Sequence, residues 1–206
     1  MHKIFSRAAP TISMKTNDIP VKDRIILDLC GGTGSWAAPY KAAGYDVRTI
    51  TLPGYDVTTY VPPVSVWGIL AAPPCTMFSL ARTNAKKPRD FREGMETVHA
   101  CLKIIWECRA AGSLKWWALE NPRCFLRQFM GKPPFQFMHC EFGDDAGKPT
   151  DLWGYYKFPR KTHPGTKPTC GRDNTESRWY NKTKSKRHLR ALTPPGFAKA
   201  FFEANR

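Results

Sequence analysis

Cys75 is the first residue in this chain whose type and setting suggest chemistry. It belongs to the sequence PPCTMFS at residues 73–79, where two prolines stiffen the backbone ahead of the cysteine. A cysteine in a polar loop directly after a strand is well placed to act as a nucleophile. A single cysteine is also often a small buried apolar residue, so this motif alone leaves both interpretations open.

Two further motifs follow apolar stretches. Glu120 begins the sequence ENP at 120–122, and a carboxyl group at the end of a buried strand can hold a raised pKa and donate a hydrogen bond. A solvated turn residue is the alternative. The sequence DLCGGTGSW at 28–36 is a glycine-rich turn, which lets a ligand approach the backbone closely. Its spacing is not the dinucleotide fingerprint GxGxxG, and a purely structural tight turn is the alternative.

The elements that must position these motifs follow from apolar patterning. Apolar residues recur at helical spacing from 91 to 105, which predicts a long amphipathic helix over 89–111. A shorter helix is expected from the glycine turn to about residue 43, and another over 195–205. Short apolar runs predict strands at 25–29, 46–51, 66–71 and 116–119. Strands that alternate with helices imply a parallel α/β sheet, with ligands at its carboxyl edge.

Composition divides the chain into four parts. Residues 1–23 are polar and irregular and are interpreted as an N-terminal arm, and 24–154 as the catalytic core. From 155 to 190 the chain has 11 Lys or Arg residues against two acidic ones, so 155–189 is predicted to be a small basic, loop-rich lobe. Residues 190–206 are expected to return to the core.

The overall charge favours a polyanionic partner. The chain has 32 basic and 17 acidic residues, a net charge of +15, and nucleic acid is the leading candidate because cations that neutralise phosphates release counterions. Seven cysteines without a CxxC pair make a poor disulfide framework and fit a reducing cytoplasm. No secretory signal or membrane span is visible. His139, Cys140, His163 and Cys170 lack the paired spacing of zinc modules, so no metal site is predicted.

Taken together, these motifs resemble those of the cytosine-C5 DNA methyltransferase family. DLCGGTGSW is similar to the family's cofactor motif, with Trp36 where phenylalanine is usual, and PPCTMFS matches its nucleophile motif closely. ENP resembles the ENV motif, and RALTP at 190–194 resembles the family sequence RxLTP. The matches span about residues 25–200. The small size and short recognition lobe resemble phage-encoded members.

The resemblance implies an S-adenosylmethionine-dependent methyltransferase sheet of the Rossmann type and a defined reaction. The Cys75 thiolate would attack C6 of a flipped-out cytosine, Glu120 would hydrogen-bond the N3/N4 edge of the base, and C5 would then accept a methyl group. The family's mobile loop corresponds to residues 76–87. The residues expected to contact nucleic acid are Ser79, Arg82, Lys86, Lys87, Asn121 and Arg190.

The resemblance also implies how S-adenosylmethionine is held. Asp28 and the glycines would line its methionine part, Trp36 would stack near the adenine, and Asp56 would meet the adenine amino group. The full set of expected cofactor-binding residues is Asp28, Gly31, Gly32, Gly34, Trp36, Asp56 and Pro73.

The chain departs from the family pattern at three places. The end of the second strand reads TITLP at 49–53, with no carboxylate for the ribose hydroxyls. The family's QxRxR segment is missing, and KPTDLW at 148–153 occupies about that place. The last family motif, with its Gly-Asn pair, is not found near the C-terminus. A different ribose contact or an altered cofactor both remain open.

We therefore expect a monomeric cytoplasmic enzyme, in a bacterium or a phage-infected host, that acts on DNA with S-adenosylmethionine. The short basic lobe, with aromatic residues nearby, predicts a short or relaxed target sequence. Its alternative is a solvated basic loop whose aromatic side chains pack underneath. Rival functions are the same fold acting on RNA or a free nucleotide, and an inactive DNA-binding protein that keeps the fold.

Overall fold

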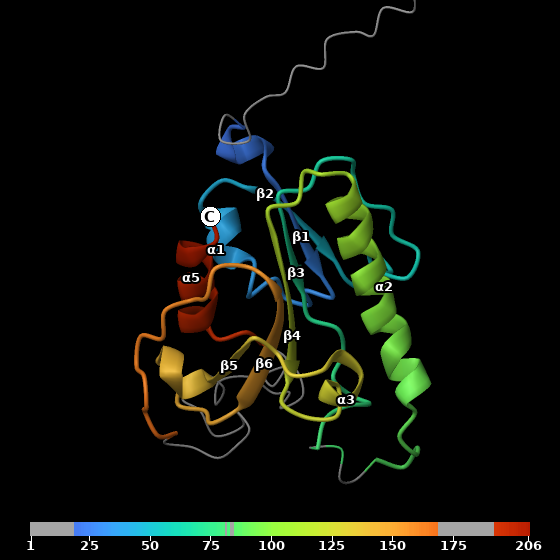
Figure 1. Ribbon diagram of the computed structural model, residues 1–206, viewed down its shortest axis with the longest axis vertical. Helices are drawn as coiled ribbons and strands as arrows, with labels where there is room; N and C mark the ends of the chain where they lie inside the picture. The colour runs from blue at the N-terminus through green and yellow to red at the C-terminus, as the bar shows by residue number, and fades with distance from the viewer. Residues whose placement is uncertain (1–18, 81, 83–84, 169–191) are drawn as a thin grey trace, which may run out of the picture.

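A six-stranded sheet forms the centre of the protein (Figure 1). The computed structural model describes residues 19–80, 82, 85–168 and 192–206. The strand order is β2-β1-β3-β4-β6-β5, and β2, β1, β3 and β4 run parallel to one another. The strands are β1 (Ile25–Leu29), β2 (Asp46–Ile50), β3 (Gly68–Ala71), β4 (Trp116–Pro122), β5 (Phe135–Met138) and β6 (Pro149–Tyr155).

The parallel half confirms the four predicted strands and the α/β fold class, and it is compatible with a Rossmann-like arrangement. β4 continues to Pro122, three residues beyond the predicted end. Glu120 and Asn121 are therefore strand residues, because each pairs with a residue of β6. Sheet pairing fixes the direction of a side chain, and it rules out the alternative of a solvated turn residue at Glu120.

The other half of the sheet corrects the expectation of a parallel sheet. β6 runs antiparallel between β4 and β5, with Leu152 opposite both Glu120 and Phe135. The sequence PTDLWGY of β6 contains proline, an aspartate and a glycine, residues that are depleted in strands, so it carries a weak strand signal. The segment KPTDLW therefore leads into the middle of the sheet, beside the strand that bears Glu120.

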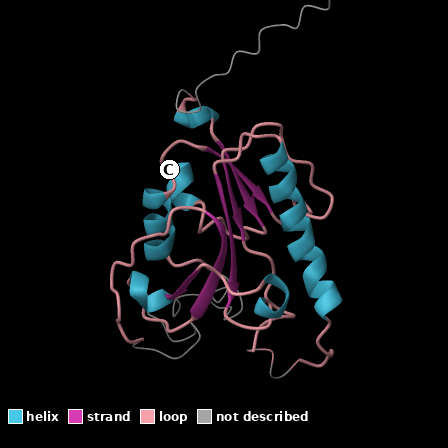
Figure 2. Cartoon of the chain, in the orientation of Figure 1, coloured by secondary structure: helices cyan, strands magenta, loops and turns pink. Residues whose placement is uncertain are grey.

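Helices cover both faces of the sheet (Figures 1 and 2). α2 (Phe91–Ala110) lies on one face, as predicted, and starts at Asp90, whose carboxylate accepts hydrogen bonds from the backbone N–H of Arg92 and Glu93. α1 (Ala38–Ala42) and α5 (Pro195–Ala204) lie on the other face. Among the helices in the described residues, none is both long and apolar enough to cross a bilayer. The remaining short helices are η1 (Val21–Asp23), α3 (Arg127–Met130) and η2 (His139–Phe142).

Strand alternation assigns the polar residues to opposite faces. Leu27 and Leu119 pack in the core beneath α2, whereas Ile26 and Ala118 pack in the core beneath α5. Because successive side chains in a strand point to opposite faces, Asp28 and Glu120 face the α5 side and Asn121 faces the α2 side.

Candidate active site

Cys75 begins a tight turn just beyond β3. The backbone N–H groups of Phe78 and Ser79 donate to the Cys75 carbonyl oxygen at 2.9 and 2.8 Å. The thiol is partly buried, and this burial raises its pKa above the usual value, an effect that the nearby Lys148 ammonium opposes and the Glu120 carboxylate reinforces. The predicted nucleophile and the predicted carboxyl group therefore lie within electrostatic range of each other.

The end of β4 is tied to the cysteine loop. The Asn121 side-chain amide donates to the Pro73 carbonyl oxygen at 2.9 Å, and Asn121 is almost fully buried. Glu120 directly precedes Asn121, and burial raises the pKa of the Glu120 carboxyl group. The Lys148 ammonium lowers this pKa, and the Asp151 carboxylate raises it further. A carboxyl group with a raised pKa can hold a proton and donate it in a hydrogen bond to a ligand. Two motifs distant in the sequence thus meet at adjacent strand ends.

A small cavity opens beside Glu120 on the α5 side of the sheet. Its polar wall includes Glu120, His139 and Lys148, and its apolar wall comes from β5 and α5. Part of the RALTP segment closes it, so this fourth predicted motif also reaches the site. The lining residues are Glu120, Phe137, His139, Lys148, Leu192, Thr193, Pro194 and Phe197.

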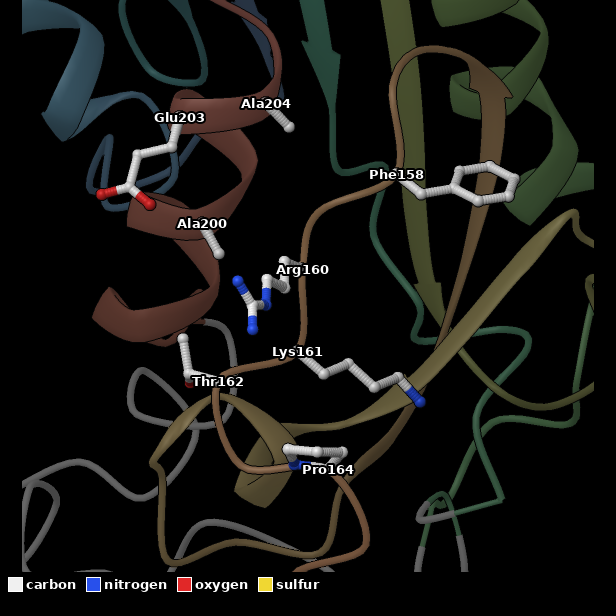
Figure 3. Close-up of a pocket in the computed structure, with 8 residues that line it drawn as sticks. All are labelled: Phe158, Arg160, Lys161, Thr162, Pro164, Ala200, Glu203 and Ala204. Atoms are coloured by element: carbon white, nitrogen blue, oxygen red, sulfur yellow. The ribbon is translucent and has the colours of Figure 1, made fainter.

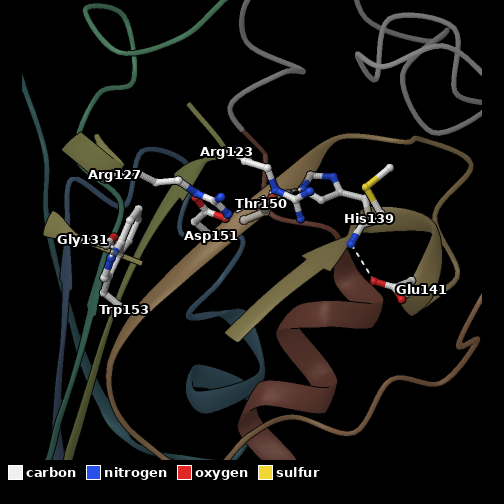
Figure 4. A network of polar contacts seen from close by, with 9 residues as sticks. Arg123, Arg127, Gly131, His139, Glu141, Thr150, Asp151 and Trp153 are labelled. Carbon is white, nitrogen blue, oxygen red and sulfur yellow. Dashed lines mark hydrogen bonds and ion pairs between the residues drawn. The ribbon is translucent and has the colours of Figure 1, made fainter. Parts of the chain in front are cut away.

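Sequence reasoning did not assign His139 or Lys148 to the site. His139 is 1% exposed, and its Nε2 lies 3.1 Å from the Thr150 hydroxyl (Figure 4). Its Nδ1 lies 3.8 Å from the Asp144 carboxylate. Burial, with a contribution from Lys148, holds the pKa of His139 well below its usual value, so the ring is neutral at physiological pH. The sequence signal was faint, because both residues reach the cavity only through the pairing of β5 and β6 with β4.

The glycine-rich turn is shaped around Asp28. A Cβ atom built on Gly31 would lie 2.1 Å from an Asp28 carboxylate oxygen, so only glycine fits there. Gly34 has a φ of 73°, in the left-handed region, and its N–H donates to the Gly31 carbonyl oxygen at 2.8 Å. The turn therefore brings its backbone against the carboxylate, as expected of a ligand-binding loop.

The Asp28 carboxylate is fully buried, and no hydrogen bond among the described residues offsets the loss of its contact with water. Its exposure is 0%, and neither carboxylate oxygen has a hydrogen-bond partner among the described residues. Burial raises its pKa from 3.8 to about 7. A buried carboxylate with two unsatisfied oxygens is costly unless a cation or several hydrogen-bond donors meet it. The site fits a ligand that carries an ammonium group.

The other expected cofactor residues lie in different settings. Trp36 is 2% exposed and packs against Phe197 and Phe201 of α5, with ring centroids 5.8 and 5.4 Å away. The exposed Asp56 accepts hydrogen bonds from the N–H and hydroxyl of Thr58, which lower its pKa. Their adenine contacts, and the cofactor roles of Gly32 and Pro73, stay predictions.

The loop after Cys75 presents several of the expected nucleic-acid residues. Arg82 donates to the backbone carbonyls of Lys87 and Pro88, and Lys86 and Lys87 are exposed. Lys87 forms an exposed ion pair with Glu93 at 2.6 Å. The ammonium groups on this loop are thus accessible to an anionic partner. Arg190 lies outside the described residues, as do most of the predicted basic lobe and most of the N-terminal arm.

A second hollow lies between α5 and the segment 158–164 (Figure 3). Its lining includes none of the residues predicted for catalysis, so we do not count it in the candidate site. It is lined by Phe158, Arg160, Lys161, Thr162, Pro164, Ala200, Glu203 and Ala204.

In the described ranges, no three or more His, Cys, Asp or Glu side chains gather in a way that could bind an ion. Cys170, one of the four residues weighed for zinc, lies outside those ranges.

No protein-family model matches the chain, and no curated protein matches it.

Proposed function

We propose that this protein is an S-adenosylmethionine-dependent methyltransferase that modifies C5 of cytosine in DNA, with Cys75 as nucleophile. The observation that carries the proposal is the meeting of Cys75 and Glu120 at the ends of adjacent strands, with Asn121 hydrogen-bonded to Pro73 between them. This arrangement supplies a thiol and a carboxyl group to one substrate.

The proposed reaction uses these two groups on the pyrimidine ring. The Cys75 thiol loses its proton, and the thiolate forms a bond to C6 of cytosine, which makes C5 electron-rich. Glu120, whose carboxyl pKa is raised by burial, donates a hydrogen bond to N3 and stabilises the charge that develops there. C5 then takes up the methyl group that S-adenosylmethionine would supply, with S-adenosylhomocysteine as the leaving group. Loss of the C5 proton to a base and of the Cys75 thiolate from C6 restores the aromatic ring. Because C5 is covered in a stacked duplex, the base must leave the helix first.

The residues around the glycine turn fit the expected cofactor. S-adenosylmethionine supplies an activated methyl group, and it carries an ammonium group on its methionine part. Asp28, buried and without a partner among the described residues, would accept hydrogen bonds from that ammonium group, and Gly31 lacks the side chain that would collide with this carboxylate. Asp28 lies on β1, which pairs directly with β3, the strand that leads to Cys75.

Covalent trapping tests the proposal. DNA containing 5-fluorocytosine should form a denaturation-resistant adduct with the protein in the presence of S-adenosylmethionine, because fluorine at C5 cannot leave as a proton does. Cys75→Ala should form none. Glu120→Gln should form the adduct about 100-fold more slowly, the usual effect of removing a group that handles a proton. Peptide mass spectrometry identifies the modified residue.

A second thiol offers a matched control. Cys124 is partly exposed and lies within electrostatic range of Cys75, so Cys124→Ser removes a neighbouring sulfur and should leave the adduct intact. An adduct that survives in Cys75→Ala, or the lack of any adduct in the wild type, would contradict the proposed mechanism. An adduct with fluorinated RNA and none with DNA would reassign the substrate.

A further inference from the structure

The turn that begins at Cys75 is held by a side chain outside every predicted motif. The Arg89 guanidinium donates one hydrogen bond to the Met77 carbonyl oxygen and another, of 3.1 Å, to the Ser79 carbonyl oxygen. Arg89 directly precedes Asp90, the N-cap residue of α2. One planar group thus links the nucleophile turn to the start of the longest helix.

Aromatic rings fix the guanidinium in turn. Its carbon lies 4.7 Å from the ring centroid of Phe125 and 5.8 Å from that of Phe91. The backbone N–H of Phe125 also donates to the Phe78 carbonyl oxygen at 3.3 Å. The segment after β4 therefore contacts both Arg89 and the turn, and the two loops of the site are joined through them.

An independent contact shows how closely α2 is fitted to this turn. A Cβ atom built on Gly94 would lie 2.8 Å from Cβ of Met77 and 2.9 Å from Cζ of Phe78. Both distances are too short for a real Cβ, so the helix needs glycine at this position to let the turn approach. α2 is thus the support against which the nucleophile turn rests.

We propose that Arg89 is a positioning residue that fixes the 75–79 turn and with it the direction of the Cys75 thiol. The inference rests on the proposed function, because it takes Cys75 to be the attacking group. Arg89 holds the carbonyls of Met77 and Ser79, while the N–H groups of Phe78 and Ser79 hold the Cys75 carbonyl. A displacement of the turn therefore moves Cys75.

The chemistry of the guanidinium explains why arginine is required. Its fork of donors can reach two carbonyl oxygens at once while its flat face stacks on an aromatic ring. A lysine ammonium keeps the charge but has neither the fork nor the flat face. A misplacement of about 1 Å in a reacting group can cost about 100-fold in rate, so loss of this clamp should appear in the chemical step.

Two variants test the proposal. We expect Arg89→Ala and Arg89→Lys each to lower kcat for DNA methylation about 100-fold while KM for DNA changes little. Millimolar methylguanidinium should restore part of the activity of Arg89→Ala, since it can occupy the same place. Arg92→Ala removes an exposed cation from the first turn of α2 and serves as the matched control, with unchanged kcat.

A second measurement does not depend on methyl transfer. The rate at which iodoacetamide alkylates Cys75 is followed against pH by mass spectrometry, and Arg89→Ala should change this profile where Arg92→Ala does not. Wild-type kcat and an unchanged profile in Arg89→Lys would overturn the inference, as would a change confined to KM. If even the wild type fails to methylate DNA, the proposed function fails, and the alkylation profile still decides the role of Arg89.

Discussion

The ionised Asp28 side chain is expected to lower the stability of the protein when no ligand is bound. It is buried and unpaired among the described residues, and burial raises its pKa from 3.8 to about 7. The folded state therefore binds a proton more tightly than the unfolded state does. The contribution of Asp28 to stability is most favourable below pH 4, falls as the pH rises towards 7, and is lowest above that.

We expect Asp28→Asn to make the ligand-free protein more stable at pH 8 than the wild type, by up to about 4 kcal/mol, and to give no gain at pH 4. The same change should weaken S-adenosylmethionine binding, because the amide cannot attract an ammonium group as a carboxylate does. Urea denaturation at the two pH values and calorimetric titration of the cofactor measure both effects. Equal stability at pH 8 combined with undiminished binding would show that Asp28 faces no cation.

The residues that sequence analysis could assign are those in contiguous motifs. Cys75 follows one apolar strand and Glu120 lies near the end of another, and strand ends at one edge of a sheet are expected to lie together. Lys148, His139 and Arg89 escaped assignment for a physical reason. Each reaches the site through a side chain or strand pairing that joins segments far apart in the sequence, and no local pattern specifies such contacts.

At the scale of elements, β6 determines where Lys148 lies, and an ion pair holds β6 to α3. Arg127 of α3 donates two hydrogen bonds to the Asp151 carboxylate, one of them 2.6 Å long, and Arg123 lies 3.7 Å from the same group (Figure 4). Asp151 is fully buried.

Close pairing of β6 with β4 also requires Gly154, since a Cβ there would lie 2.1 Å from the Trp117 carbonyl oxygen.

Arg127→Met should destabilise the protein by about 3 kcal/mol, because it leaves the buried Asp151 carboxylate without its main partner. Arg48→Met removes an exposed pair with Asp46, in which two guanidinium nitrogens donate to one carboxylate oxygen, and should cost less than about 1 kcal/mol. Urea unfolding monitored by circular dichroism compares the two variants. Similar losses in both would mean that burial of Asp151 adds nothing to the strength of its pair.

Element prediction succeeded where periodicity is strong and failed where it is broken. α2 has a long apolar periodicity and the four parallel strands coincide with short apolar runs, and the structure has them close to the expected bounds. β5 is short, and β6 contains a proline, an aspartate and a glycine. Their place in the sheet comes from pairing with β4, which outweighs the weak local preference for strand.

At the scale of the molecule, the net charge of +15 bears on the proposed partner. We expect binding to duplex DNA to weaken about 1000-fold between about 50 and 200 mM salt, as counterion release requires when several phosphates are neutralised. Fluorescence anisotropy measures the affinity at each salt concentration. A duplex with uncharged methylphosphonate linkages is the control and should bind weakly at every concentration. Affinity for natural DNA that is independent of salt would argue against phosphate contacts.

The residues that flank α5 form hydrogen bonds with residues near the glycine turn and α1. The Thr193 N–H donates to the Ser35 hydroxyl at 3.0 Å, next to the glycine turn, and the Tyr40 hydroxyl donates to the Asn205 carbonyl oxygen at 3.2 Å. While a ribosome is still making the protein, these partners do not yet exist, so the part of the sheet that α5 covers stays exposed until residue 205 has emerged. Closing such long loops is slow, and the nascent chain is therefore exposed to aggregation and proteolysis until synthesis of this last segment is complete.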